Sequence, residues 1–424
     1  MFKIYKKKYK NGLRALVIPI EENPTVSVMV MTATGSNYEN EDNSGVSHFL
    51  EHLLFKGTVK RPASKIISEE FENMGSVNDA FTEKETTTYF AKGDSKNFSK
   101  MLDVISDIYL NAVIPEEEME KEKGVVLEEI NMYEDIPQYK VEELLDNLLY
   151  MGQPAGRSIA GTKENIKKMT RNDILDYKEK NYVASKTLVV VTGKIKPNTV
   201  FKEVENKFKN ISQNKGLKLS KTKENQSVTQ VVIQNKKTDQ THLSFGFRSF
   251  SYLESKKSTS LSLLGDILGS GMSSRLFLRL REEMGVAYYV SAHNNTFKDH
   301  GFFCIRSGVN NSRAKEVIRV ILDECKKVIE DGVSQRELNR VKTMRISLLK
   351  MSFESSNNIA GFYGYRELQE HKTISLAERI KEIKEVTPED IKKIAKRILK
   401  NDNLNLAIVG PNLNEKEIKK VCKF

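Results

Sequence analysis

The chain has 424 residues, enough for two or three ordinary domains, and its 39% hydrophobic and 29% charged content is typical of a soluble globular protein. No apolar run approaches the roughly 18 residues of a membrane-spanning helix, and the opening segment lacks the apolar core of a secretion signal, so we expect a cytoplasmic protein without a membrane partner. The net charge of +11 raises the question of nucleic acid, but lysines alternate with acids as on solvated helix faces, and we expect no such partner.

The first element that we expect is a lysine-rich strand near the N-terminus. In KIYKKKYKNG (residues 3–12), lysines alternate with tyrosines. Lysines protect an exposed edge strand from pairing with other chains, so the segment is typical of a sheet edge. Phosphate binding by the same lysines is the alternative.

The segment SGVSHFLEHLLFKGT (residues 44–58) predicts a helix with a metal-binding face. His48 and His52 are four positions apart and share one face of a helix, and Glu51 lies beside the second histidine. Two histidines at this spacing suit zinc, although a surface helix with two unremarkable histidines is the alternative. Against that alternative, the flanking residues are apolar: Phe49, Leu50, Leu53, Leu54 and Phe55.

A catalytic zinc commonly takes three protein ligands, and the acid-rich helix expected over 116–135 offers the best candidates for the third. Glu129 shares a face with apolar residues and is the better buried ligand, whereas Glu128 lies on the polar side. Glu122 is two turns before Glu129 on the same face. Its distance along the axis favours a supporting or gating role over direct ligation, and we group it with the catalytic residues.

A polar stretch near the middle of the chain predicts a linker. Residues 208–227 are rich in Lys, Asn and Ser, which is typical of a segment outside a packed core. We therefore expect an N-terminal zinc-binding domain over 1–210, a linker over 211–227 and a C-terminal domain without metal ligands over 228–424.

The two halves of the chain resemble each other at an offset of 217 residues. Residues 169–193 align without a gap with residues 386–410, and Thr170 meets Thr387. In both copies the Thr caps a helix, and a β-branched strand follows that ends at Gly. The chain is therefore predicted to be a duplicated α/β unit. At the same offset the two histidines stand opposite glycines, so we expect one metal site per chain.

The motifs resemble the pitrilysin and insulinase family of zinc metallopeptidases, the inverzincins, over essentially the whole chain. The resemblance rests on HFLEH with a Glu 77 positions after its second His, and on further landmarks in the family's order. These landmarks are NGLRALVIP (11–19), GSNYE (35–39), NDAFTEKETTTYF (78–90), GRSIAGTKENI (156–166) and GMSSRLFLRLREEMGVAYYV (271–290). The length resembles the short branch of the family, which is typified by mitochondrial processing peptidase and its bacterial relatives.

The resemblance implies an α+β fold of the LuxS/processing-peptidase-like type. It has two homologous domains, each an antiparallel sheet packed with helices, and two chains pair as a clamshell dimer around a chamber. It also implies that His48, His52 and Glu129 bind one zinc per chain and that Glu51 is the general base for zinc-bound water. The expected function is zinc-dependent endopeptidase hydrolysis of short unstructured peptides inside that chamber.

Substrate contacts are implied as well. The strand containing Asp79, Ala80, Phe81 and Thr82 resembles the family's edge strand, onto which an extended peptide adds. The family usually has Asn before this Ala, whereas Asp79 stands here. The carboxylate adds negative charge that would favour basic peptides, or it is a turn residue without such a role.

In the second half, Arg281 and Tyr288 match a family pair that contacts the substrate or the developing oxyanion across the chamber, so the resemblance places both among the catalytic residues. Without the resemblance, Arg281 would pass for a surface ion-pair partner. Their spacing of seven places both on one helical face only if the helix continues through Gly285, and the alternative is that this glycine ends the helix. Retention of the pair favours a homodimer. The alternatives are a heterodimer with a related chain, in which this subunit is inactive alone, and a non-catalytic peptide-binding scaffold.

Overall fold

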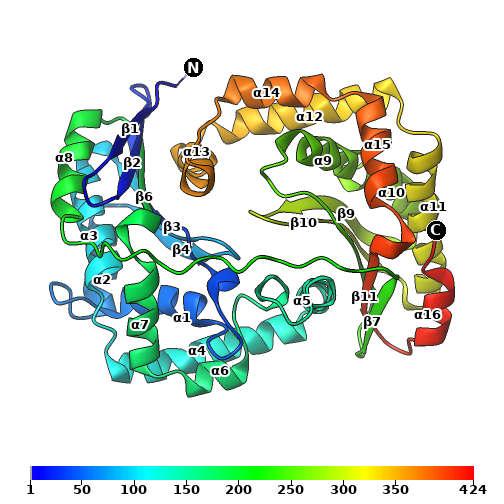
Figure 1. Ribbon diagram of the computed structural model, residues 1–424, viewed down its shortest axis with the longest axis horizontal. Helices are drawn as coiled ribbons and strands as arrows, with labels where there is room; N and C mark the ends of the chain where they lie inside the picture. The colour runs from blue at the N-terminus through cyan, green and yellow to red at the C-terminus, as the bar shows by residue number, and fades with distance from the viewer. Residues whose placement is uncertain (1) are drawn as a thin grey trace. The chain divides into compact units, whose positions relative to one another are not determined.

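The computed structural model describes residues 2–424 and divides into two compact units, each with one sheet (Figure 1). The first unit comprises Met1–Ile130, Ser158–Ser220 and Leu349–Leu376, and the second comprises Asn131–Arg157, Lys221–Leu348 and Ala377–Phe424. Helices pack on both sheets, so a two-unit α+β architecture agrees with the prediction. Pairing of two chains stays a prediction.

The first unit holds a six-stranded sheet. Its strands are β1 (Tyr5–Lys8), β2 (Arg14–Pro19), β3 (Thr25–Thr32), β4 (Val77–Thr82), β5 (Thr87–Asp94) and β6 (Thr187–Gly193). Its helices are α1 (Val46–Leu53), α2 (Ser64–Asn73), α3 (Phe98–Asn111), α6 (Lys163–Lys168), α7 (Arg171–Asn181), α8 (Pro197–Lys207), α13 (Ser356–Glu370) and most of α4 (Glu116–Asp135).

The second unit holds a five-stranded sheet. Its strands are β7 (Gln230–Asn235), β8 (Thr241–Arg248), β9 (Ala287–Thr296), β10 (Gly301–Val309) and β11 (Leu404–Gly410). Its helices are α5 (Pro137–Leu149), α9 (Ser255–Gly269), α10 (Arg275–Phe277), a π-helix (Leu278–Glu283), α11 (Ala314–Glu330), most of α12 (Gln335–Ser352), α14 (Leu376–Glu385), α15 (Pro388–Ile398) and α16 (Glu415–Val421).

The sheets are mixed, so the expectation of purely antiparallel sheets was wrong. The strand order is β1-β2-β6-β3-β5-β4 in the first unit and β7-β11-β8-β10-β9 in the second. β6 is parallel to β2 and antiparallel to β3, and β11 is parallel to β7 and antiparallel to β8. The reason is geometric, because a strand inserted between two antiparallel neighbours must run parallel to one of them.

The structure confirms the internal duplication. α7 and α15 each begin after a Thr-Asp capping box, Thr170 with Asp173 and Thr387 with Asp390. The strands that follow, β6 and β11, are fully buried, and their bounds of 187–193 and 404–410 differ by the expected 217. Equivalent local sequence therefore forms the same helix–strand unit in both halves.

The sheet of the first unit buries both faces. Leu16, Met31 and Val190 pack with Tyr363 of α13 on one face, and α3 and α8 contact the sheet on strands β2, β3 and β5. Side chains alternate along a strand, so the apolar residues between these positions face the other way. α13 lies against β3 and β6, and this position is visible in Figure 1.

The compact units differ from the predicted boundaries in two segments. Residues 131–157, with α5, belong to the second unit, and residues 349–376, with α13, belong to the first. α5 packs Val141 and Leu145 against Phe302 of β10 within the second unit. A sequence boundary at 211–227 still describes the duplication, but each sheet receives one helix from the other half of the chain.

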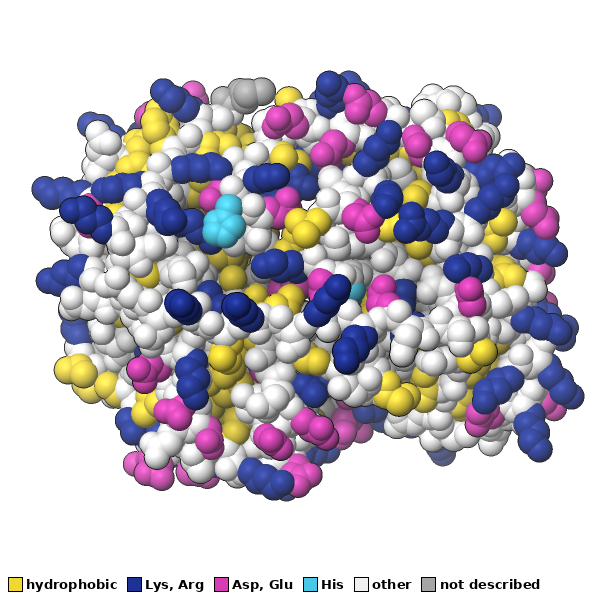
Figure 2. Space-filling view, viewed as in Figure 1, with side chains coloured by type: hydrophobic (Ala, Val, Ile, Leu, Met, Phe, Trp, Pro, Cys, Tyr) yellow, Lys and Arg dark blue, Asp and Glu magenta, His cyan; other side chains and the backbone are white. Residues whose placement is uncertain are grey.

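The lysine-rich N-terminal segment forms an edge strand, as expected. β1 is the outermost strand of its sheet, and two of its lysines make ion pairs, Lys6 with Glu367 at 2.6 Å and Lys7 with Glu205 at 2.7 Å. On the face shown in Figure 2, lysine and arginine side chains lie among acidic and uncharged ones.

Candidate active site

The helix that carries the metal candidates, α1, has a fixed N-terminus. Gly45 precedes it with a φ of 98°, and a Cβ at this position would lie 2.7 Å from the carbonyl oxygen of Ala160. The Glu39 carboxylate accepts hydrogen bonds from the backbone amides of Gly45 and Ser47, at 2.7 and 2.8 Å. These amides have no partner within the helix, and a carboxylate is favoured at a helix N-terminus.

α1 turns an apolar face into the core and presents its histidines to α4. Phe49, Leu50 and Leu53 are fully buried. The side chains of His48 and His52 are only 12% and 21% exposed, and their rings approach edge to face with centroids 4.7 Å apart. The spacing of four residues therefore brings both imidazoles to one place, as predicted from the sequence.

α4 supplies the third candidate ligand. Nε2 of His48 and Nε2 of His52 lie 3.3 Å apart, and Oε2 of Glu129 lies 3.5 and 3.6 Å from them. Zinc bonds of about 2.0 to 2.1 Å in tetrahedral geometry place neighbouring ligand atoms about 3.3 to 3.4 Å apart. The three atoms therefore fit one zinc ion, and among residues 2–424 they form a compact group of potential metal ligands.

Glu122 lies behind His52 rather than in the ligand group. Its Oε1 is 2.9 Å from His52 Nδ1, and its Oε2 is 2.6 Å from Lys56 Nζ. A neutral His52 that donates its Nδ1–H to Glu122 presents the lone pair of Nε2 to the ligand group. The geometry thus gives Glu122 the supporting contact expected from its two-turn separation from Glu129.

The two histidines have different electrostatic surroundings. Burial, and then the charge of His52, lowers the pKa of His48 to about 4, so that His48 is neutral near pH 7 and can donate a lone pair. Burial also acts to lower the pKa of His52, but the hydrogen bond to Glu122 and the nearby carboxylates outweigh it, so this pKa is raised. Nδ1 of His48 is buried without a hydrogen-bond partner in the described part of the chain.

Glu51 lies on α1 next to the ligand group and is held by the edge strand. The hydroxyl of Thr82 donates a 2.5 Å hydrogen bond to Glu51 Oε2. Burial raises the pKa of Glu51 to about 7, although the Thr82 hydrogen bond and the His52 charge act against it. A carboxylate with a pKa near the working pH is well suited to general base catalysis.

The other edge-strand residues lie on β4, which is the outermost strand of its sheet. Asp79 is exposed, and its Oδ1 accepts a 2.8 Å hydrogen bond from the Ala80 amide. Its charge acts to raise the pKa of Glu51. The Phe81 ring packs near Phe90 of the adjacent strand, with centroids 6.4 Å apart. The structure thus brings the edge strand to the general-base candidate.

Arg281 and Tyr288 both lie in the second unit. The π-helix that carries Arg281 ends at Glu283, Gly285 has a φ of 62°, and Tyr288 lies on β9. The condition for one shared helical face is therefore not met, because the helix ends before Gly285, as the alternative expectation had it. The guanidinium of Arg281 donates a hydrogen bond to the backbone carbonyl of Tyr288. Tyr288 as a residue is 57% exposed.

Two contacts of the site were not predicted. Lys56 stands four residues after His52, so helical spacing was a signal for its meeting with Glu122. Thr82 was expected to contact substrate, and its bond to Glu51 was not foreseen. Alternation along a strand tells which side chains share a face, but not which helix that face meets.

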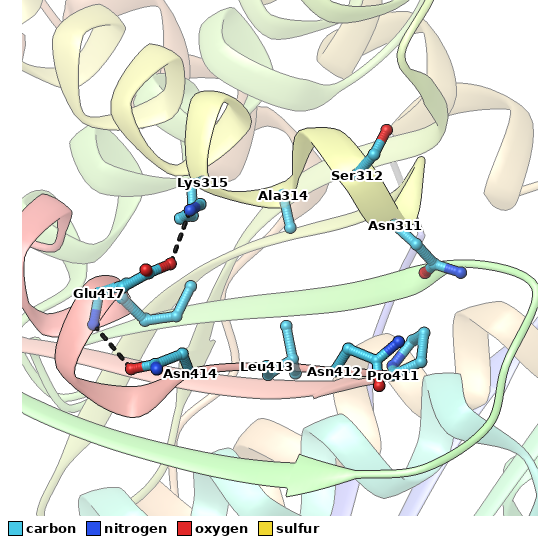
Figure 3. Close-up of a pocket in the computed structure, with 10 residues that line it drawn as sticks. Asn311, Ser312, Ala314, Lys315, Pro411, Asn412, Leu413, Asn414 and Glu417 are labelled. Carbon is cyan, nitrogen blue, oxygen red and sulfur yellow. Dashed lines mark hydrogen bonds and ion pairs between the residues drawn. The ribbon is translucent and has the colours of Figure 1, made fainter.

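A separate pocket of about 370 Å³ lies in the second unit, between the start of α11 and the loop that joins β11 to α16 (Figure 3). An ion pair between Lys315 and Glu417, at 2.7 Å, links its two walls. None of the predicted site residues lines this pocket.

Among the described helices, none combines the length and apolar character that crossing a bilayer requires.

Comparison with known proteins identifies relatives over almost the full length. Models of the Insulinase (Peptidase family M16) domain and of the Peptidase M16 inactive domain match residues 15–163 and 168–345. The uncharacterized zinc protease YmxG of Bacillus subtilis is 33% identical over 409 residues, covering 96% of this chain and 98% of that protein. An uncharacterized zinc protease of Rickettsia bellii is 33% identical over 405 residues, covering 96% and 97%.

Solved structures show the same fold at lower identity. A protease from Helicobacter pylori superposes with a TM-score of 0.91 at 24% identity, covering 97% of this chain and 100% of that chain. A peptidase M16 inactive domain structure from Pseudomonas fluorescens gives 0.89 at 18% identity, covering 97% and 99%. With both family models and both relatives in agreement, the chain belongs to the insulinase family, peptidase family M16.

Proposed function

We propose that the protein is a zinc-dependent endopeptidase that hydrolyses short unstructured peptides. The observation that carries the proposal is the triangle of His48, His52 and Glu129 donor atoms, with the Glu51 carboxylate on the same helix. The family and the relatives named zinc proteases support a peptidase.

His48, His52 and Glu129 would hold the zinc, which when bound supplies a Lewis acid that polarises a peptide carbonyl and acidifies water. Glu51 takes a proton from the attacking water as its oxygen bonds to the carbonyl carbon. Glu51 then returns that proton to the leaving amine as the C–N bond breaks. Glu122 keeps His52 in the tautomer and orientation that ligation requires.

An extended peptide would bind along β4. An exposed sheet edge offers unpaired main-chain groups to which a further strand can add, and main-chain pairing requires an unfolded segment. β4 is at such an edge, and Thr82 connects it to Glu51. Short unstructured peptides are therefore the proposed substrates, with the exposed Asp79 favouring basic ones.

The proposed active unit is a homodimer that encloses a chamber, in which Arg281 and Tyr288 contact the substrate. The chain's own possession of this pair and of the complete ligand set supports self-association over a heterodimer. Solution mass measured by light scattering tests the proposal. A mass of one chain, combined with activity that appears only after addition of a related chain, would replace the homodimer with the heterodimer.

The function is tested by incubating the purified protein with a mixture of short peptides while zinc content is determined on the same sample. Glu51→Gln is expected to keep zinc and to lose about 10² to 10⁴-fold in rate, because a neutral amide cannot accept the proton. Glu128→Gln, which changes an exposed acid on α4, is the matched control and should cleave normally. Removal of zinc by a chelator should abolish cleavage, and one equivalent should restore it.

Stoichiometric zinc without cleavage of any peptide would contradict a self-sufficient peptidase. A Glu51→Gln protein as active as the parent would contradict the role of Glu51 as general base.

A further inference from the structure

We propose that Thr82 is a positioning residue for Glu51, and that it couples addition of a peptide to β4 with alignment of the general base. The inference rests on the proposed peptidase function and assigns Thr82 a role in addition to the substrate contact predicted for it. It starts from one hydrogen bond, from Thr82 Oγ1 to Glu51 Oε2 at 2.5 Å.

This hydrogen bond constrains the side chain that must move a proton. A glutamate has three rotatable side-chain torsions, so an untethered carboxylate samples several orientations. The Thr82 hydroxyl engages one carboxylate oxygen and leaves the second to act as base. Hydrogen bonds to charged groups are stronger than neutral ones, and a partly buried one resists competition from water.

The backbone of Thr82 faces the edge at which a peptide would add. The amide of Glu83 donates to the carbonyl of Thr86 at 2.8 Å, which marks residues 83 and 86 as a hydrogen-bonded pair of the hairpin. Such pairs alternate with non-bonded pairs along antiparallel strands. In the register Thr82↔Thr87 and Phe81↔Thr88, the main-chain groups of Phe81 therefore pair with β5, whereas those of Thr82 point to the open edge.

Ala80 provides an independent check of this assignment. It lies two residues before Thr82, so its main-chain groups should also point to the open edge. Its amide does donate to the Asp79 side chain, at 2.8 Å, rather than to β5. A peptide strand that pairs with Ala80 and Thr82 would thus order the residue whose hydroxyl holds Glu51.

The coupling predicts a specific kinetic signature. Loss of the Thr82 hydroxyl should lower kcat, because the misaligned base affects the chemical step, while KM should change little. Removal of one hydrogen bond to a charged group, together with the misalignment of the base that follows, should lower kcat by about 10- to 100-fold.

Two substitutions at position 82 separate the hydroxyl from the side-chain shape. Thr82→Val keeps the branched shape and removes the donor, and Thr82→Ser keeps the donor. Thr86→Val is the matched control, because Thr86 on the same hairpin donates an equivalent hydrogen bond, at 2.9 Å, to the carboxylate of Glu83 away from the ligand group. Each protein is assayed for kcat and KM on one peptide, and for zinc content and thermal stability.

The expected result is low kcat for Thr82→Val, recovery to within about threefold for Thr82→Ser, and parental zinc content throughout. Thr86→Val should retain the parental kcat. A Thr82→Val protein with parental kcat, an equal loss in Thr82→Ser, or a rise in KM alone would each overturn the proposal.

Crystal structures of the zinc-loaded parent and of zinc-loaded Thr82→Val test the positioning role without an activity assay. The Glu51 carboxylate should hold one orientation in the parent and several in the variant. An unmoved carboxylate overturns the positioning role even if the parent hydrolyses peptides. A reoriented carboxylate in an otherwise inactive protein supports the positioning role and contradicts the peptidase function.

Discussion

Replacement of Glu122 should weaken zinc binding although Glu122 is not a ligand. Its carboxylate bridges His52 Nδ1, at 2.9 Å, and Lys56 Nζ, at 2.6 Å, and its side chain is 9% exposed. Burial acts to raise the pKa of Glu122, but hydrogen bonds from His52 and Lys56 outweigh it and keep the pKa low. The ionised carboxylate therefore orients His52 with its Nε2 toward the ligand group.

The expected loss of zinc affinity depends on which interactions with His52 and Lys56 each substitution at position 122 keeps. Residues that orient a metal-binding histidine are typically worth 10- to 100-fold in metal affinity. Glu122→Gln keeps an acceptor for the His52 Nδ1–H and loses only the charge, so a loss of about tenfold, or about 1.4 kcal/mol, is expected. Glu122→Ala also removes the acceptor and leaves two partly buried donors, His52 and Lys56, without it, so a loss of about 100-fold is expected.

Zinc affinity should be measured by competition with a chromogenic chelator at pH 8, where protons compete little for the imidazoles. The control is Glu118→Gln, which breaks an ion pair with Lys121 on the outer face of α4 and should leave the affinity unchanged. Parental zinc affinity in Glu122→Ala would refute the reasoning, because the contact to His52 would then have no influence on ligation.

Other predictions concern stability and substrate preference. Arg61→Met should destabilise the first unit by about 3 kcal/mol in urea unfolding, because Asp107 loses a buried ion pair of 2.7 Å. Arg279→Met, at an exposed pair, should leave the urea midpoint unchanged. Burial acts to raise the pKa of Asp107, but its hydrogen bonds hold this pKa below the ordinary 3.8. The stabilisation that the ionised Asp107 contributes to folding is therefore present above about pH 4 and is lost as the pH falls. The free energy of unfolding should fall more steeply with decreasing pH in the parent than in Arg61→Met. The third prediction compares two peptides that differ only in a lysine or a glutamine at one position. In Asp79→Asn, the kcat/KM for the lysine peptide divided by that for the glutamine peptide should fall by about two- to fivefold at low salt. An unchanged quotient would exclude a role for the Asp79 charge.

The candidate ligand group was predictable because helical spacing and the family motif, HFLEH with a Glu 77 positions after its second His, indicated the same three residues. The four-residue spacing of His48 and His52 fixes their common face, and the apolar pattern around Glu129 distinguishes it from Glu128. The structure places His48, His52 and Glu129 together, and it gives Glu122 the supporting contact that its two-turn separation indicated.

The sequence did not predict that α5, from the first half of the chain, packs in the second unit and that α13, from the second half, packs in the first. α5 and α13 show apolar positions at helical spacing, which indicates burial against a sheet but not against which sheet. Both sheets offer buried β-branched surfaces, since β6 and β11 are equivalent, fully buried strands in the two halves. The choice depends on contacts far apart in the chain, such as those of Arg14 with the last-turn carbonyls of α13 at Glu367 and Leu368.

The presence of one candidate metal-ligand group among residues 2–424 has a steric explanation in the second half of the chain. At the offset of 217, His48 and His52 correspond to Gly265 and Gly269 on α9. A Cβ at Gly269 would lie 2.4 Å from the amide nitrogen of Ala292 on β9, and one at Gly265 would lie 3.0 Å from its carbonyl oxygen. A side chain at position 269 would therefore force α9 away from β9.

The two copies of this helix have thus diverged toward incompatible uses. In α1, side chains at the two positions project from the helix and meet Glu129, which requires space between the helix and its neighbours. In α9, the missing side chains allow the helix backbone to approach the strand closely, which contributes packing in place of a site. Histidines introduced at positions 265 and 269 would first have to separate α9 from its sheet, so restoring the HxxEH spacing in the second half cannot by itself create a second zinc site.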